Sequence, residues 1–242
     1  MFEFLKKIMD SKDLISKKDD NSIHRVLKTD LKKDPSVEED EIIFGCGCFW
    51  GAEKCFWKLP GVITTSVGYA GGKKNNPTYY EVCSGLTGHS EVVRVIWNKR
   101  EIDVSDLLKM FWECHDPTQK NRQGNDMGTQ YRSAIYYKNE NNIKIILASK
   151  EQYQTELSKN NIGLIETEIK MIDSYFYAEQ YHQQYLASAG SRQYCSASPT
   201  KVKLGVFIGS NYKLEDNIWE NFNWEVDKCV LRSDNNPIKN KI

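Results

Sequence analysis

The chain has 242 residues, enough for one large domain or two small ones, and its hydrophobic content of 40% is enough for a substantial core. Its 33 basic and 33 acidic residues are balanced and scattered, so charge gives no reason to expect nucleic acid, and no apolar run has the length of a membrane span. Seven cysteines without regular spacing, in a chain whose start lacks a signal-peptide pattern, indicate a reducing, cytoplasmic compartment in which one or a few thiols react.

Composition divides the chain into three parts. Residues 1–40 are rich in Lys, Asp, Ser and Asn and are predicted to form a mobile leader, in which His24 is expected to be solvated. Residues 41–200 are predicted to form the catalytic domain. Residues 201–242 are expected to be a C-terminal extension that wraps over the core.

The hydrophobic pattern predicts alternating strands and helices. Strands are expected at 42–44, 62–69, 89–97, 131–137 and 166–172, helices at 52–58, 106–114, 142–158 and 178–187, and loops at 79–88 and 118–130. Some successive strands lie too close for a crossover helix. The fold class that fits is an α/β (α+β) two-layer sandwich with a mixed or antiparallel central sheet, a ferredoxin-like core and a long irregular C-terminal tail.

One cysteine stands at a predicted strand-to-helix turn. Gly45 and Gly47 allow a sharp turn, which places Cys48 in the first turn of the following helix. Unpaired N–H groups and the positive end of the helix dipole favour an anion there, so the thiol is expected to ionise more easily than a free one. Phe49 and Trp50 follow directly and are expected to wall an apolar pocket. This arrangement favours attack on a small apolar group that carries one polar atom.

Several motifs, in one order, resemble those of a known family. They are Gly-Cys-Phe-Trp-Gly at 47–51, Gly-Tyr-Ala-Gly-Gly at 68–72, Pro-Thr-Tyr-Tyr-Glu-Val-Cys-Ser-Gly at 77–85, Gly-His-Ser-Glu-Val-Val at 88–93, His-Asp-Pro-Thr at 115–118, Asn-Asp-Met-Gly-Thr-Gln-Tyr-Arg-Ser at 125–133 and Ala-Glu-Gln-Tyr-His at 178–182. From about residue 41 to residue 186 the sequence is similar to peptide methionine sulfoxide reductase A. The resemblance implies reduction of methionine S-sulfoxide, free or in proteins, to methionine.

The resemblance also implies roles for individual side chains. Cys48 would attack the sulfoxide sulfur, and Glu91 would protonate the sulfoxide oxygen. The alternation of its strand puts Glu91 on an apolar face, where burial is expected to raise its pKa. Tyr79 and Tyr131 would hold the oxygen. Phe49 and Trp50 would bind the S-methyl group, and Asp126 would position the substrate.

A second thiol is needed to clear the sulfenic acid left on Cys48. Cys195 resembles the family's resolving cysteine, so a Cys48–Cys195 disulfide is implied, with thioredoxin, or dithiothreitol in vitro, as reductant and no bound cofactor. The sequence departs from the family here: Ser-Ala-Ser-Pro at 196–199 replaces a glycine-rich tail, and a recycling cysteine close behind is missing. Cys229 is an alternative for this relay.

Two other function classes use similar residues. A cysteine hydrolase needs a His oriented by Asn or Asp, and no segment resembles such a partner. A metal-binding module using Cys46, Cys48 and Cys55 would lack paired C-x₂-C knuckles, so no metal site is predicted. We interpret three thiols as buried and chemically unreactive: Cys55, Cys83 and Cys114. The favoured interpretation of Cys46 is the same. The expected partners are oxidised proteins, free methionine sulfoxide and thioredoxin, with no nucleic acid or membrane, and the chain is expected to be a monomer.

Overall fold

The structure is a computed structural model, which describes residues 22–226 and 229–239. Its strands are β1 (Glu39–Cys46), β2 (Val62–Ala70), β3 (Ser90–Asn98), β4 (Arg122–Gln123), β5 (Asp126–Met127), β6 (Ser133–Tyr137), β7 (Glu168–Met171) and β8 (Tyr175–Tyr177). Its α-helices are α2 (Phe49–Trp57), α3 (Tyr79–Cys83), α4 (Val104–Cys114), α5 (Asn142–Lys159), α6 (Asp216–Trp219) and α7 (Cys229–Arg232), and 3₁₀ turns occur at Thr129–Tyr131, Gln180–His182 and Tyr185–Ala187.

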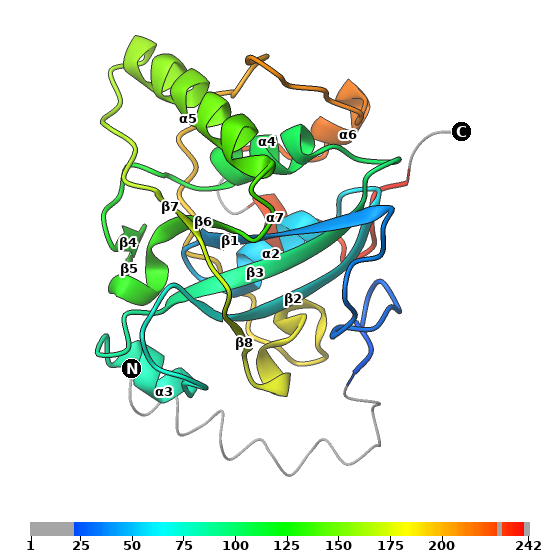
Figure 1. Cartoon of the computed structure of the whole chain (residues 1–242), viewed down its shortest axis with the longest axis vertical. Helices are drawn as coiled ribbons and strands as arrows, with labels where there is room; N and C mark the ends of the chain where they lie inside the picture. Colours follow the sequence, from blue (N-terminus) through cyan, green and yellow to red (C-terminus); the bar gives the residue numbers. More distant parts are fainter. Residues whose placement is uncertain (1–21, 227–228, 240–242) are drawn as a thin grey trace.

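A six-stranded sheet in the order β7-β6-β1-β3-β2-β8 forms the centre of the described chain (Figure 1). Neighbouring strands are antiparallel except β6 and β7, which are parallel. The predicted α/β fold with a mixed sheet is therefore confirmed. The connectivity β1-α2-β2-β3-α4-β6 follows the β-α-β-β-α-β order that a ferredoxin-like core requires; that finer description stays a prediction.

The pleat of β1 divides the core into two clusters. Ile42, Phe44 and Cys46 belong to the large cluster, and Ile43 belongs to the small one on the opposite face. Helices α2, α4 and α5 gather over the face of the large cluster (Figure 1). The ring of Phe44 stacks on Phe56 of α2 at 4.8 Å and on Phe111 of α4 at 5.1 Å between ring centroids. This packing fixes the end of β1 against the start of α2.

The segment predicted as a helix at 178–187 is not one. It contains two 3₁₀ turns, and Tyr175–Tyr177 before it forms β8 at the edge of the sheet. The side chain of Gln183 explains the difference, because it accepts a hydrogen bond from Val67 N at 2.9 Å and donates to Val67 O and Ala178 O. The amide group thus takes the place of a strand partner on β2, which a regular helix could not do.

Two predicted loops also contain regular structure. The stretch 79–88 begins with α3, which starts in a capping box between Thr78 and Glu81. The stretch 118–130 contains the short hairpin of β4 and β5. Both short elements border the site described below.

The described part of the expected leader packs on the sheet. His24 is fully buried, and its Nε2 lies 2.9 Å from Thr65 Oγ1 on β2. The expectation that His24 is solvated is therefore wrong, because residues 22–31 bury it against β2 and Trp57. The prediction that the leader is mobile also concerns residues 1–21, which are outside the residues that the structure describes.

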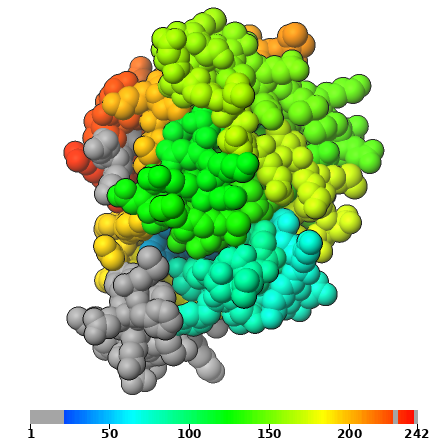
Figure 2. Space-filling view, turned by 90° about the vertical axis from the view of Figure 1, so that its left-hand side faces the viewer, coloured from blue at the N-terminus to red at the C-terminus, as the bar shows by residue number. Residues whose placement is uncertain are grey.

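The C-terminal residues lie along the outer side of α2. Lys54 Nζ donates to Ser233 O at 2.7 Å, Trp57 Nε1 donates to Asn235 O at 3.0 Å, and Ile238 N donates to Lys58 O at 2.9 Å. In the space-filling view the orange and red residues lie on the body of the molecule (Figure 2). Within the part of the chain that the structure describes, no helix is long and apolar enough to cross a bilayer.

Candidate active site

Cys48 lies in the two-residue connection between β1 and α2. It is the N-cap of α2, and Gly47 before it has φ +83°, a conformation that favours glycine. A Cβ built on Gly47 would lie 2.5 Å from Gln123 Cβ, so a side chain there would collide with the β4–β5 hairpin. Cys48 itself is only 9% exposed, so its thiol lies below the surface.

Glu91 lies beside this helix start. It is 2% exposed on β3, and its Oε2 accepts a hydrogen bond from Phe49 N at 3.1 Å. Burial raises its pKa to about 8, although the Phe49 N–H opposes the shift. The predicted rise is therefore confirmed, and near neutral pH the carboxyl holds a proton that it can donate.

The expected easy ionisation of Cys48 is wrong for the resting state. Burial raises the pKa of its thiol well above the usual value, and the nearby Glu91 raises it further. The Trp50 N–H lowers it, as the helix-start argument expects, but this effect is smaller. The thiol and the carboxyl therefore both hold their protons at rest, which keeps net charge out of an apolar pocket.

Two tyrosine hydroxyls lie near Glu91: that of Tyr79 also hydrogen-bonds Cys83, and that of Tyr131 also lies near Cys48. Burial, followed by the charge of Glu91, raises the pKa values of both Tyr79 and Tyr131. Both hydroxyls therefore remain donors across the physiological range. The backbone of Tyr79 is anchored because its N–H donates to Glu179 Oε1 at 2.9 Å.

Aromatic rings form the wall next to Cys48. The Phe49 ring lies 5.1 Å from the ring of His182, and Trp50 stacks on Tyr185 at 3.8 Å. Trp50 Nε1 donates to His182 Nδ1 at 3.1 Å, and burial lowers the pKa of His182 to about 3. The imidazole is therefore neutral, and it fixes the indole rather than acting as a base.

Asp126 lies near Cys48 and Glu91, and its charge raises the pKa values of both groups. Its Oδ1 accepts a hydrogen bond from Tyr194 OH at 2.6 Å, and its Oδ2 is buried without a hydrogen-bond partner among the described residues. An unpartnered carboxylate oxygen at this place can accept a hydrogen bond from a substrate amide. Sequence reasoning did not identify Tyr194, because nothing local to it indicates contact with a residue 68 positions earlier.

Sequence reasoning assigned no catalytic role to His182 or Glu179. Both lie in the motif at 178–182, which was the available signal. Glu179 accepts hydrogen bonds from Tyr69 OH at 2.8 Å and from Tyr79 N. It therefore connects β2 to the residue whose hydroxyl faces Glu91.

Cys195 packs on the same helix as Cys48. It is 5% exposed, and a Cβ built on Gly51 would lie 2.5 Å from its Sγ. Gly51 is three residues after Cys48, so both thiols lie at the first turn of α2. Cys229 is the first residue of α7, and the structure describes its backbone but not its side chain.

Replacing Gly51 by Ala is expected to displace Cys195. Alanine favours a helix over glycine by about 1 kcal/mol, but overpacking costs roughly 1–3 kcal/mol. We expect the Cys48–Cys195 disulfide that the resemblance implies to form in lower yield, as measured by mass spectrometry after mild oxidation of the reduced protein. Gly163→Ala is the matched control, because a Cβ there meets nothing within 4 Å. Equal disulfide yields in both variants would contradict the assigned contact.

Cys48 can attack, Glu91 can supply a proton, and Cys195 can reach the same helix turn. The class of protein is therefore a thiol-dependent oxidoreductase. The sequence model of the family described as peptide methionine sulfoxide reductase matches residues 40–211. The chain belongs to this family, and within it to the A type.

Individual relatives agree with this assignment. A peptide methionine sulfoxide reductase MsrA from Vibrio vulnificus is 53% identical over 180 residues, which cover 74% of this chain and 86% of the relative. A mitochondrial peptide methionine sulfoxide reductase from Mus musculus is 56% identical over 166 residues, which cover 69% and 71%. The solved structure of methionine sulfoxide reductase A of Corynebacterium diphtheriae is 41% identical, with a TM-score of 0.64 and coverage of 76% and 88%.

Proposed function

We propose that the chain reduces the S epimer of methionine sulfoxide, free and in proteins, with Cys48 as the nucleophile and Glu91 as the acid. The observation that carries the assignment is the buried Glu91 carboxyl, which is held by Phe49 N–H next to the Cys48 thiol and has a pKa of about 8. A sulfoxide sulfur becomes electrophilic when its oxygen is protonated. The site therefore carries the acid where the nucleophile needs it.

The first step balances within the site. Cys48 Sγ attacks the sulfoxide sulfur, and the oxygen takes the Glu91 proton while Tyr79 and Tyr131 donate hydrogen bonds to it. The bond between the two sulfurs then breaks as the oxygen, with its proton, passes to Cys48 Sγ, so Cys48 becomes a sulfenic acid and methionine leaves. The proton of the Cys48 thiol returns to Glu91, so the carboxyl is restored. Phe49 and Trp50 hold the S-methyl group, and Asp126 Oδ2 accepts a hydrogen bond from the substrate.

The second step restores the thiol. Cys195 Sγ attacks Cys48 Sγ, a Cys48–Cys195 disulfide forms, and the sulfenic oxygen leaves as water with the thiol proton. Thioredoxin, or dithiothreitol in vitro, then supplies two electrons and two protons to reduce the disulfide. The chain needs no bound cofactor for this cycle, works as a monomer and resides in the cytoplasm.

Epimer specificity tests the proposed function. Purified full-length protein is incubated with dithiothreitol and either the S or the R epimer of dabsyl-methionine sulfoxide, and dabsyl-methionine is quantified. We expect formation of the product from the S epimer only. An inactive protein, or one that prefers the R epimer, would contradict the assignment.

Replacing Cys195 by Ser is expected to separate the two steps. Serine cannot form a disulfide, so the variant should release one methionine per chain and then stop under thioredoxin-linked turnover. The measurement compares methionine released in a single turnover with the steady-state rate of thioredoxin oxidation. A normal steady-state rate would refute Cys195 as the resolving thiol and favour Cys229.

The cysteine hydrolase alternative is not favoured. Its His must be oriented by Asn or Asp next to the nucleophile. At the candidate site the imidazole near Cys48 belongs to His182, whose Nδ1 accepts a hydrogen bond from the indole of Trp50. With its pKa lowered to about 3, His182 is a poor base for a thiol whose own pKa is raised.

A further inference from the structure

A cavity lined by four cysteines lies behind the catalytic helix. Its sulfur-bearing residues are Cys46, Cys55, Cys114 and Cys195, and the apolar part of its lining includes Ala52, Pro199, Trp224, Val226 and Val230. Cys48 does not line this cavity. The cluster is therefore separate from the attacking thiol, and the reaction proposed above uses only Cys195 of the four.

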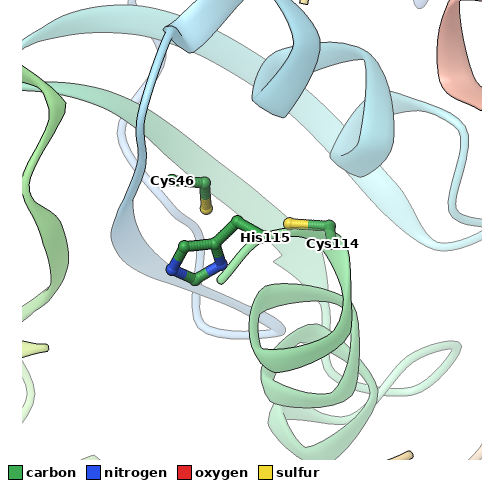
Figure 3. A group of neighbouring side chains, drawn as sticks. All are labelled: Cys46, Cys114 and His115. Atoms are coloured by element: carbon green, nitrogen blue, oxygen red, sulfur yellow. The ribbon is translucent and has the colours of Figure 1, made fainter. Parts of the chain in front are cut away.

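Three potential ligands lie together at this place: Cys46 and Cys114 line the cavity, and His115 follows Cys114 in the chain. Figure 3 shows Cys46 at the end of β1, with Cys114 and His115 at the end of α4. One donor atom from each residue lies within 4.8 Å of the other two, and all three residues are buried. Ligands of a tetrahedral zinc ion lie roughly 2.0–2.3 Å from the metal, which puts them about 3.3–3.8 Å from one another. An inward movement of about 1 Å would complete such a geometry.

The imidazole of His115 has the hydrogen-bond pattern of a metal ligand. Its Nδ1 lies 2.7 Å from Phe111 O, an acceptor, so Nδ1 carries the proton and Nε2 is the nitrogen with a lone pair. Nε2 accepts a hydrogen bond from Ser133 Oγ at 2.8 Å, and Ser133 keeps Thr167 Oγ1 as a partner if an ion replaces that bond.

The charge balance favours a divalent ion. The Cys114 thiol shares hydrogen bonds with Cys46 and Cys55. A thiophilic cation displaces such protons when it binds. Two thiolates, one neutral imidazole and one divalent cation sum to zero charge, so the complex avoids the cost of a buried net charge.

We propose that Cys46, Cys114 and His115 bind a thiophilic divalent cation of the Zn²⁺ class, with the fourth coordination position open to the cavity. This proposal replaces the sequence-based expectation of no metal site. Spacing could not reveal the set, because Cys46 comes from β1 and the other two residues from the end of α4. The proposal does not depend on the proposed reductase activity.

Cobalt is the probe for this site. The full-length Cys48→Ala protein, reduced and freed of reductant under anaerobic conditions, is titrated with CoCl₂. We expect thiolate-to-cobalt charge-transfer absorption and tetrahedral ligand-field bands, which Zn²⁺ should abolish by displacement. Because this variant lacks the nucleophile, failure of the proposed reductase reaction would leave the binding result intact.

Second substitutions in the Cys48→Ala background assign the ligands. Cys46→Ala and Cys114→Ala should each lose the thiolate bands, and His115→Gln should weaken cobalt binding at least about 10-fold. Cys83→Ser is the matched control and should bind as the parent does. If a ligand variant does not fold by circular dichroism, X-ray absorption of the parent complex should show two sulfur ligands. Three results would overturn the proposal. The parent could show no thiolate bands, the folded Cys46→Ala and Cys114→Ala proteins could retain them, or His115→Gln could bind cobalt with unchanged affinity.

Discussion

Cys48→Ser is expected to abolish sulfoxide reduction. A serine hydroxyl neither attacks a sulfoxide sulfur at neutral pH nor forms a sulfenic acid, and loss of a nucleophile costs on the order of 10⁴-fold or more in kcat. The measurement is dithiothreitol-dependent formation of methionine from the S epimer. Since the side chain is nearly buried and similar in size, the fold should persist.

A second cysteine provides the control for that result. Cys83 is half-buried in α3, and its serine variant can keep a hydrogen bond with Tyr79. Cys83→Ser should therefore retain most of the activity. If Cys48→Ser retained comparable activity, the nucleophile would have to be another thiol and the account would fail.

Glu91→Gln is expected to lower kcat by roughly 100- to 1000-fold with little change in KM. The amide keeps the shape of the carboxyl, but it has no proton to give to the sulfoxide oxygen. Steady-state kinetics with dithiothreitol would measure the loss. Glu140→Gln, which changes an exposed carboxyl, should behave as the unmodified protein does. A Glu91→Gln variant with normal kcat would exclude Glu91 as the acid.

The pH dependence should follow the same carboxyl. Because the acid must be protonated and its pKa is about 8, kcat should fall as the pH rises above about 8, and this fall should be absent in Glu91→Gln. The pKa of Glu91 in the folded chain lies above the ordinary glutamate value of 4.5, so the folded chain binds the additional proton. Stability from this group is therefore present at low pH and is lost as the pH rises from about 4.5 to about 8. Thermal unfolding across that range should be less pH-dependent in Glu91→Gln.

The sequence predicted the central pair of the site for a local reason. Alternation along β3 places Glu91 on the face of Val93 and Val95, and that face packs on the large core. The glycine turn places Cys48 at the start of α2. Short-range patterns therefore determined which side chains face the site and from which elements they come.

The parts that sequence reasoning missed depend on long-range contacts of irregular chain. Gln183 satisfies the backbone of Val67 from 116 residues away, which no periodicity indicates. Tyr194 reaches Asp126 in the same manner. The pKa of Cys48 was predicted in the wrong direction because the helix-start argument contains no desolvation, which arises only when the surrounding chain covers the thiol.

The most direct test is to locate the oxygen after one turnover. Full-length Cys195→Ser protein receives one equivalent of S-epimer methionine sulfoxide and dimedone, without reductant, and its peptides are analysed by mass spectrometry. The account predicts one equivalent of methionine and a dimedone adduct on Cys48. Methionine released with an unmodified Cys48, or with the adduct on another cysteine, would contradict it.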